Sequence, residues 1–190
     1  MNAQPFIVGL GGTTRVGSTS ERALAAALAE AQALGCETAL LGSVDLPVEP
    51  YDPTRPERSP QALALVAALR RADGVIIASP SYHGGLSGLV KNAIDFVEDM
   101  RGDARPYFEG RAVGCIVCAE GPQAMGSTLA SLRAVVHALR GWPTPYGAAL
   151  NTREAPFGNA EKPADPAALK ACQLVGREVV QFARWVRGEG

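Results

Sequence analysis

A short apolar run, a polar turn and a helical pattern follow one another within residues 6–24, and this order constrains the fold of the 190-residue chain most strongly. Residues 6–10 are apolar, and Gly11 and Gly12 end the run. The turn and the first helical positions contain five hydroxyl side chains and one cation: Thr13, Thr14, Arg15, Ser18, Thr19 and Ser20. A helix N-terminus exposes unpaired N–H groups, so a turn of this composition favours a phosphate monoester. An ordinary serine cap on the helix is the alternative interpretation.

Two common phosphate-binding motifs do not fit this turn. A Walker loop needs a lysine that the turn lacks, and a dinucleotide fingerprint starting at Gly9 would need glycine where Thr14 stands. The remaining option is a loop of hydroxyls and amides around a mononucleotide. The stretch G-T-T-R-V-G-S-T-S, residues 12–20, resembles the G-S-x-R-x-x-S-x-N loop of the NADPH-dependent FMN reductase family, which has a flavodoxin-like fold.

Apolar runs alternate with helical patterns along the rest of the chain. Strands are expected at 6–11, 37–42, 74–79, 112–119 and 145–149, and helices at 18–34, 59–71, 85–98, 126–140 and 165–187. The strands are apolar on consecutive positions, so helices should cover both faces of the sheet. We therefore expect an α/β, flavodoxin-like fold: one doubly wound five-stranded parallel sheet of order 2-1-3-4-5, in a single domain over residues 1–190.

Composition and charge exclude several classes of partner. With 47% hydrophobic residues and a net charge of −1, the chain should form a globule with no general attraction to nucleic acid or anionic membranes. The first residues, MNAQPFIVGL, lack the basic segment of a signal peptide, and no apolar run reaches the ~18 residues of a membrane span. We therefore expect a cytoplasmic protein.

The four cysteines predict buried thiols rather than a metal or redox site. Cys115 and Cys118 form a C-x-x-C, but within an apolar strand, where residues three apart point to opposite faces. Cys36 and Cys172 are isolated, and no His-Cys cluster is present for zinc. Free cysteine commonly packs as a small hydrophobe.

The loop after the third expected strand carries a second resemblance to the same family. Residues 80–95 match its P-x-Y-N-G-x-x-P-G-x-x-K-N-A-I-D segment, which holds the flavin ring and ribityl chain, with His83 at the usual Asn and Ser87 at the usual Pro. The loop after the fourth strand, with Glu120 and Gly121, matches more loosely. The resemblance thus implies an FMN site formed by Thr13, Arg15, Ser18, Thr19, Ser20, Pro80, Ser81, Tyr82, His83, Gly84, Glu120 and Gly121.

Other residues have less specific interpretations. Lys91 and Asp95 form an i,i+4 pair that a solvated helix face explains as well as a ligand does. Tyr51 either edges the cofactor site or fixes a loop. His137 stands alone in a helical segment, so we expect it to be packed or exposed and not catalytic.

The resemblance implies a NAD(P)H-dependent FMN reductase without catalytic side chains, because flavin carries the redox chemistry. Hydride would pass from NADPH, or from NADH, to FMN, and the reduced flavin to a monooxygenase or another acceptor. A reductase with firmly bound FMN acting on quinones, azo dyes or metal ions is the alternative. A flavodoxin-type electron carrier is less favoured, since such carriers are strongly acidic and this chain carries a net charge of −1.

We also expect a homodimer or homotetramer with the flavin close to the interface. Family members pair through elements next to the flavin. Apolar Leu89, Ile94, Phe96 and Val97 in the segment after the ring loop exceed what one buried stripe requires.

Overall fold

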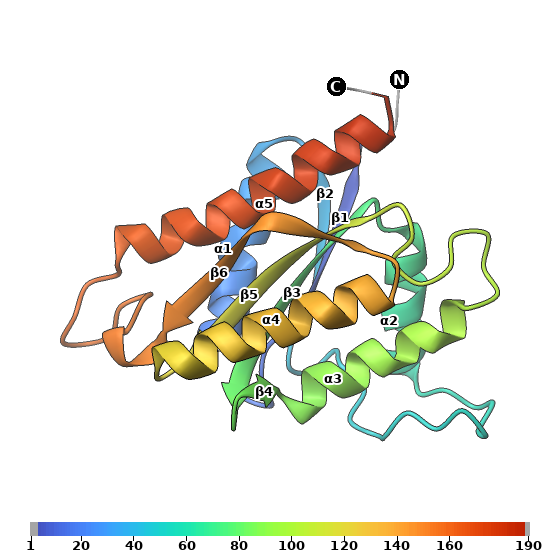
Figure 1. The fold of residues 1–190 in the computed structure, drawn as a ribbon, viewed down its shortest axis with the longest axis horizontal. Helices are drawn as coiled ribbons and strands as arrows, with labels where there is room; N and C mark the ends of the chain where they lie inside the picture. The colour runs from blue at the N-terminus through green and yellow to red at the C-terminus, as the bar shows by residue number, and fades with distance from the viewer. Residues whose placement is uncertain (1–3, 189–190) are drawn as a thin grey trace.

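The computed structural model describes residues 4–188 and contains one mixed sheet (Figure 1). Five strands are parallel in the order β2-β1-β3-β5-β6, as the sequence predicts. Their bounds are β1 (Phe6–Gly11), β2 (Glu37–Leu41), β3 (Gly74–Tyr82), β5 (Ala112–Ala119) and β6 (Trp142–Asn151). Residues 1–3 and 189–190 of the expected domain lie outside the described residues.

The count of five strands is wrong, because a sixth strand, β4 (Gly85–Leu86), pairs antiparallel with the end of β3. β3 continues past the expected residue 79 to Tyr82, and the chain then turns back within two residues. His83 and Gly84 make this turn with φ of 54° and 79°, the pair of positive values that a tight type I′ hairpin requires. Gly84 adopts such a value without steric cost.

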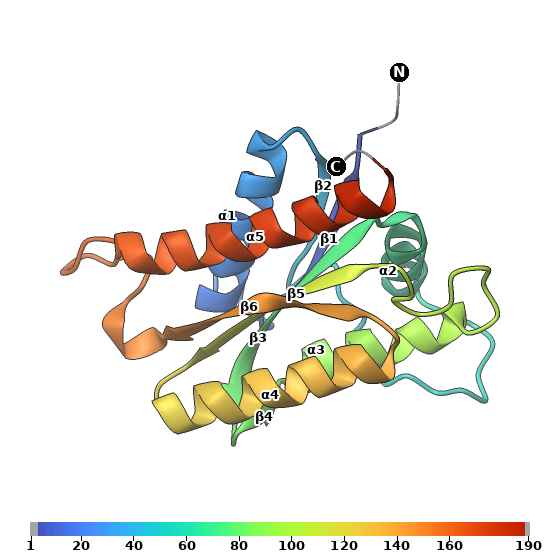
Figure 2. The same cartoon turned by 45° about the horizontal axis from the view of Figure 1, so that its top comes forward.

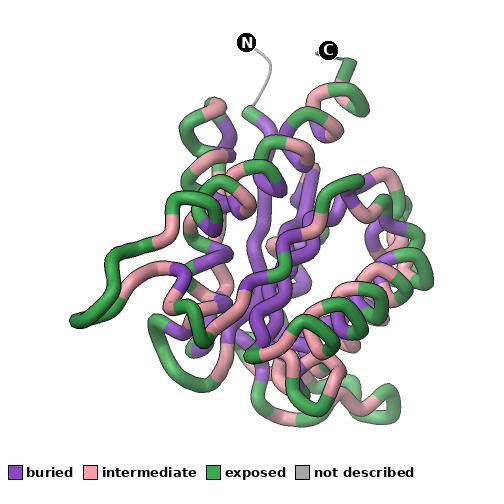
Figure 3. Tube along the Cα trace, turned by 60° about the vertical axis from the view of Figure 1, so that its left-hand side comes forward, coloured by how far each residue is buried: buried purple, intermediate pink, exposed green. Residues whose placement is uncertain are grey.

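Helices cover both faces of the sheet (Figure 2). One face packs against α1 (Thr19–Ala33) and α5 (Pro166–Val186). The other packs against α2 (Pro60–Arg71), α3 (Gly88–Asp95) and α4 (Pro122–Ala138). The strands between the two helix layers are the most continuously buried part of the chain (Figure 3).

Two of the expected helix boundaries differ from the structure. α4 begins at Pro122 rather than at residue 126, because proline is favoured in the first turn of a helix and Gly121 takes the preceding cap position. The helix expected at 85–98 is shorter: α3 ends at Asp95, and a 3₁₀ helix, η1 (Phe96–Met100), continues the chain.

The apolar residues expected to be surplus at an interface belong to the core, so that expectation is wrong. Ile94, Phe96 and Val97 are at most 2% exposed, and Leu89 is partly buried against the same core. Phe96 and Val97 lie in the first turn of η1 and continue the buried side of α3, which carries Val90, Ala93 and Ile94. The oligomeric state itself stays a prediction.

The four cysteines are buried, as expected. Cys115 belongs to the core under α2, α3 and α4, and Cys118 to the core under α1 and α5, so their side chains lie on opposite faces of the sheet. Burial raises the pKa of each of these two thiols to about 12. None of the helices within residues 4–188 combines the length and hydropathy of a bilayer-spanning segment.

Candidate functional site

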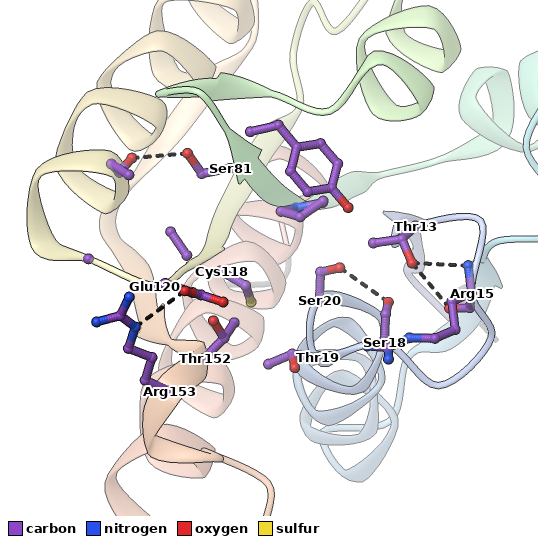
Figure 4. A pocket seen from close by; sticks show the side chains of 15 residues that line it. Thr13, Arg15, Ser18, Thr19, Ser20, Ser81, Cys118, Glu120, Thr152 and Arg153 are labelled. Atoms are coloured by element: carbon purple, nitrogen blue, oxygen red, sulfur yellow. Dashed lines mark hydrogen bonds and ion pairs between the residues drawn. The ribbon is translucent and has the colours of Figure 1, made fainter.

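A cavity of about 600 Å³ opens at the carboxyl ends of β1, β3, β5 and β6 (Figure 4). Ten of the twelve residues proposed from the sequence line it: Thr13, Arg15, Ser18, Thr19, Ser20, Pro80, Ser81, Tyr82, Glu120 and Gly121. Cys118, Ala119, Ala124, Thr152 and Arg153 complete the lining. The volume lies in the range of ~300–1,000 Å³ that is typical of small-molecule sites.

The first wall of the cavity depends on a close approach of the ends of β1 and β3. A Cβ on Gly11 would lie 2.0 Å from the backbone oxygen of Ala78, so only glycine fits at this position. The next N–H group, of Gly12, donates to the same oxygen at 3.1 Å. This contact fixes where the chain leaves the sheet and therefore where the hydroxyl-rich turn begins.

The serine cap, the alternative interpretation of the sequence, is present in this turn. Ser18 Oγ accepts from the N–H of Glu21 at 3.4 Å, and Glu21 Oε2 accepts from the N–H of Gly17 at 2.8 Å. A cap and an anion site do not exclude each other here. The N–H groups of Thr19 and Ser20, at the first two helical positions, have no acceptor within the helix.

Arg15 is the cation of this wall. Its side chain is exposed, and none of the ion pairs among residues 4–188 involves it. Thr13 Oγ1 accepts from the backbone N–H of Arg15 at 3.0 Å, which fixes the turn that carries the guanidinium. The wall thus combines a helix N-terminus, hydroxyls and an unpaired guanidinium, which are the groups that bind a phosphate dianion.

The second wall is the end of β3. Ser81 Oγ lies 2.7 Å from Thr128 Oγ1 of α4, so its hydroxyl is already engaged, while Tyr82 is 55% exposed. His83 and Gly84 lie at the tip of the β3–β4 hairpin and do not line the cavity. A contact of these two residues with a flavin stays a prediction.

The third wall contains a charged pair of which the sequence indicated Glu120 but not Arg153. Arg153 Nε lies 3.2 Å from Glu120 Oε2, and both side chains are more than 70% exposed. Thr152 and Arg153 follow β6. In doubly wound sheets a ligand binds outside the carboxyl ends of the strands where the strand order reverses, and this rule directs attention to the loops after β1, β3 and β5 instead. No local pattern in the sequence singles out Thr152 and Arg153, since tertiary folding alone brings them to the cavity.

Three residues with open interpretations in the sequence lie outside this cavity. The ring of Tyr51 packs edge-on against that of Phe96, with 5.2 Å between the ring centroids. The backbone N–H of Tyr51 donates to Asn92 Oδ1 at 2.8 Å, so this residue fixes a loop. Lys91 and Asp95 form an exposed ion pair at 2.6 Å. Within the described residues, no group of three or more potential ligands could hold a metal ion.

Comparisons with known proteins identify a family and a shared fold. The model of a family described as NADPH-dependent FMN reductase matches residues 5–154. The apo form of an NADH:FMN oxidoreductase has a TM-score of 0.66 at 18% identity, covering 95% of this chain and 89% of that one. An oxidoreductase from Corynebacterium diphtheriae has a TM-score of 0.68 at 17% identity, covering 95% and 97%. A Streptococcus flavodoxin has a TM-score of 0.62 at 10% identity, covering 92% and 98%. These structures share the fold.

Proposed function

We propose that this chain, which belongs to the NADPH-dependent FMN reductase family, binds FMN in the cavity at the carboxyl ends of its strands and reduces it with NAD(P)H. Membership confirms the resemblance seen in residues 12–20 and 80–95 and makes the protein a flavin-dependent oxidoreductase. The position of the flavin, the nucleotide preference and the acceptor are our proposals.

The donor set of the cavity fits FMN. The first wall offers the helix N-terminus, hydroxyls and the guanidinium of Arg15 to the terminal phosphate: Thr13, Arg15, Ser18, Thr19 and Ser20. The second and third walls offer backbone and flat surfaces to the ring and the ribityl chain: Pro80, Ser81, Tyr82, Glu120 and Gly121. No carboxylate pairs with Arg15 in residues 4–188, so its charge is available to the phosphate.

When bound, FMN supplies the redox chemistry by accepting a hydride from a reduced nicotinamide and passing two electrons to an acceptor. The protein's part is to hold the phosphate at one end, to orient the ring and to leave room for the nicotinamide beside it. We propose no acid–base side chain, because hydride transfer to flavin needs none from the protein. In the absence of ligand, the exposed carboxylate of Glu120 forms an ion pair with the guanidinium of Arg153.

The observation that carries this proposal is the unpaired Arg15 beside the N-terminus of α1, at one end of the cavity. The test is a fluorescence titration of the purified protein with FMN, FAD and riboflavin. FMN should bind most tightly, since it alone presents a terminal phosphate dianion. Equal affinity for FMN and riboflavin would refute the phosphate assignment.

The donor and the acceptor need a separate assay. We propose NADPH as donor, with NADH also accepted, and a monooxygenase or small molecule as acceptor. Oxidation of each nucleotide should be measured with free FMN, with benzoquinone and without acceptor. Turnover that needs added FMN identifies a flavin reductase, whereas flavin that copurifies and reduces benzoquinone identifies the firmly bound form. We also propose a homodimer or homotetramer, which light scattering at micromolar concentration tests.

A further inference from the structure

We infer that Arg153 binds a phosphate group of the hydride-donating dinucleotide, and that Glu120 holds this guanidinium when no donor is bound. The inference rests on the proposed function, since it takes the cavity to be the flavin site. Three observations support it. Arg153 lies across the cavity from Arg15, it forms an ion pair with Glu120, and that ion pair is exposed and therefore weak.

Arg153 lies away from the site that we propose for the FMN phosphate. Arg15 follows β1 and Arg153 follows β6, and the order β1-β3-β5-β6 places these strands three spacings apart. At ~4.8 Å a spacing the two strands lie about 14 Å apart. Figure 4 shows the two arginines on opposite sides of the cavity. A single phosphate bound at the N-terminus of α1 therefore leaves Arg153 for another anion.

The backbone around Arg153 is fixed at the cavity edge. Asn151 Oδ1 accepts from the backbone N–H of Arg153 at 3.1 Å, and Asn151 Nδ2 donates to Glu154 Oε1 at 2.8 Å. The neighbouring carboxylate of Glu154 is thus engaged elsewhere. Among residues 4–188 the ion-pair partner of Arg153 is Glu120.

The pair with Glu120 can be exchanged at little cost. Its side chains are 72% and 71% exposed, and one nitrogen–oxygen distance of 3.2 Å joins them. Ion pairs with such exposure contribute little to stability, so an incoming phosphate can replace the carboxylate. A phosphate also accepts from a guanidinium through two oxygens, a geometry that strengthens the replacement.

The chemistry of the cavity points to a donor that is itself a phosphate ester. Its charged lining consists of two arginines and one glutamate, which leaves a positive balance for anionic ligands. A reduced nicotinamide dinucleotide carries a diphosphate, and NADPH carries a 2′-phosphate in addition. Either group has the chemistry to take the guanidinium from Glu120.

The test compares donors with and without phosphate, at saturating FMN and with the full chain. We expect Arg153→Ala to lower kcat/KM for NADPH by about 10–100-fold relative to kcat/KM for 1-benzyl-1,4-dihydronicotinamide, which has no phosphate. The loss should lie in KM, since the arginine binds the donor away from the reacting carbon. Glu120→Gln should change KM for NADPH in the opposite direction, lowering it a few-fold, because the competing carboxylate is gone.

A matched control is available in Arg140, whose ion pair with Glu109 also measures 3.2 Å and lies outside the cavity. Arg140→Ala should leave the ratio of the two donors unchanged. If Arg153→Ala lowers kcat/KM for NADPH but not for NADH, the arginine contacts the 2′-phosphate. If kcat/KM falls equally for both nucleotides, the arginine contacts the diphosphate.

Two results would overturn the inference. One is an unchanged ratio of kcat/KM for NADPH to kcat/KM for the phosphate-free donor in Arg153→Ala, whether neither value falls or both fall equally. The other is an FMN affinity reduced as much as in Arg15→Ala. Failure of the proposed function looks different, since the wild-type chain would then neither bind FMN nor oxidise any donor.

Discussion

Replacing Gly11 by alanine tests whether the contact between the ends of β1 and β3 builds the phosphate-binding turn. The new Cβ would lie 2.0 Å from the Ala78 oxygen, about 1.4 Å short of an ordinary 3.4 Å contact. Both partners are backbone, so neither can rotate away. The strand ends must separate, and the hydrogen bond from Gly12 N–H to that oxygen, 3.1 Å long, is lost with them.

Three contributions lower the free energy of unfolding of the Gly11→Ala variant. Overpacking costs ~1–3 kcal/mol, the positive φ of 151° adds ~1–3 kcal/mol for a residue with a side chain, and the lost hydrogen bond adds ~0.5–1.5 kcal/mol. We expect Gly11→Ala to lower the free energy of unfolding by about 3–6 kcal/mol, and to weaken FMN binding because the turn is displaced.

Urea unfolding and FMN titration measure the two effects. Gly17→Ala is the control, since Gly17 lies in the same turn at φ +71°, but a Cβ added there would have no other atom within 4 Å. It should show only the backbone strain, ~1–2 kcal/mol. A Gly11→Ala variant as stable as Gly17→Ala, with wild-type FMN affinity, would refute the role given to this contact.

Three further predictions concern charge and burial. Arg15→Ala should weaken FMN binding by ~1.5–3 kcal/mol, the worth of a charge-assisted hydrogen bond, and leave riboflavin binding nearly unchanged in a parallel titration. Arg111 is 1% exposed and donates to four backbone carbonyls. Arg111→Ala should therefore lower the free energy of unfolding, measured in urea, by ~3–5 kcal/mol. The control is the exposed Arg101→Ala, which should lower it by less than ~0.5 kcal/mol. The buried thiols Cys115, Cys118 and Cys172 have pKa values raised from 9.0 to about 12. The folded state therefore keeps protons that the unfolded state loses, so thermal melts should show stability falling as the pH rises from 9 to 12; a flat profile there would contradict this.

The parallel sheet could be predicted because its signals are local. Each central strand is a short apolar run, and each helix begins after a polar cap or with a proline in its first turn, such as Ser18, Ser59 or Pro166. The order of the strands then follows from the general topology of doubly wound sheets.

What could not be predicted depends on how distant segments meet. Strand β4 needs only Gly85 and Leu86 and has too few residues to show a period. Phe96 is covered by Tyr51 and Arg58 of the loop before α2, a contact between distant segments that apolar spacing does not reveal. Arg153 reaches the cavity only because β6 lies beside β5, and its partner Glu120 is 33 residues earlier in the chain.

Helix α5 has a consequence for where the chain can be cut. The family match ends at residue 154, yet α5 (Pro166–Val186) packs against α1, the helix whose N-terminus forms one wall of the cavity. A Cβ on Gly176 of α5 would lie 2.3 Å from the backbone oxygen of Ala27 in α1, so the two helices touch backbone to backbone. A fragment of residues 5–154 would uncover Ala27 of α1 and the face of β3 and β5 on which Val175 and Val179 of α5 pack. The region that defines the family is therefore smaller than the smallest piece of this chain that we expect to fold.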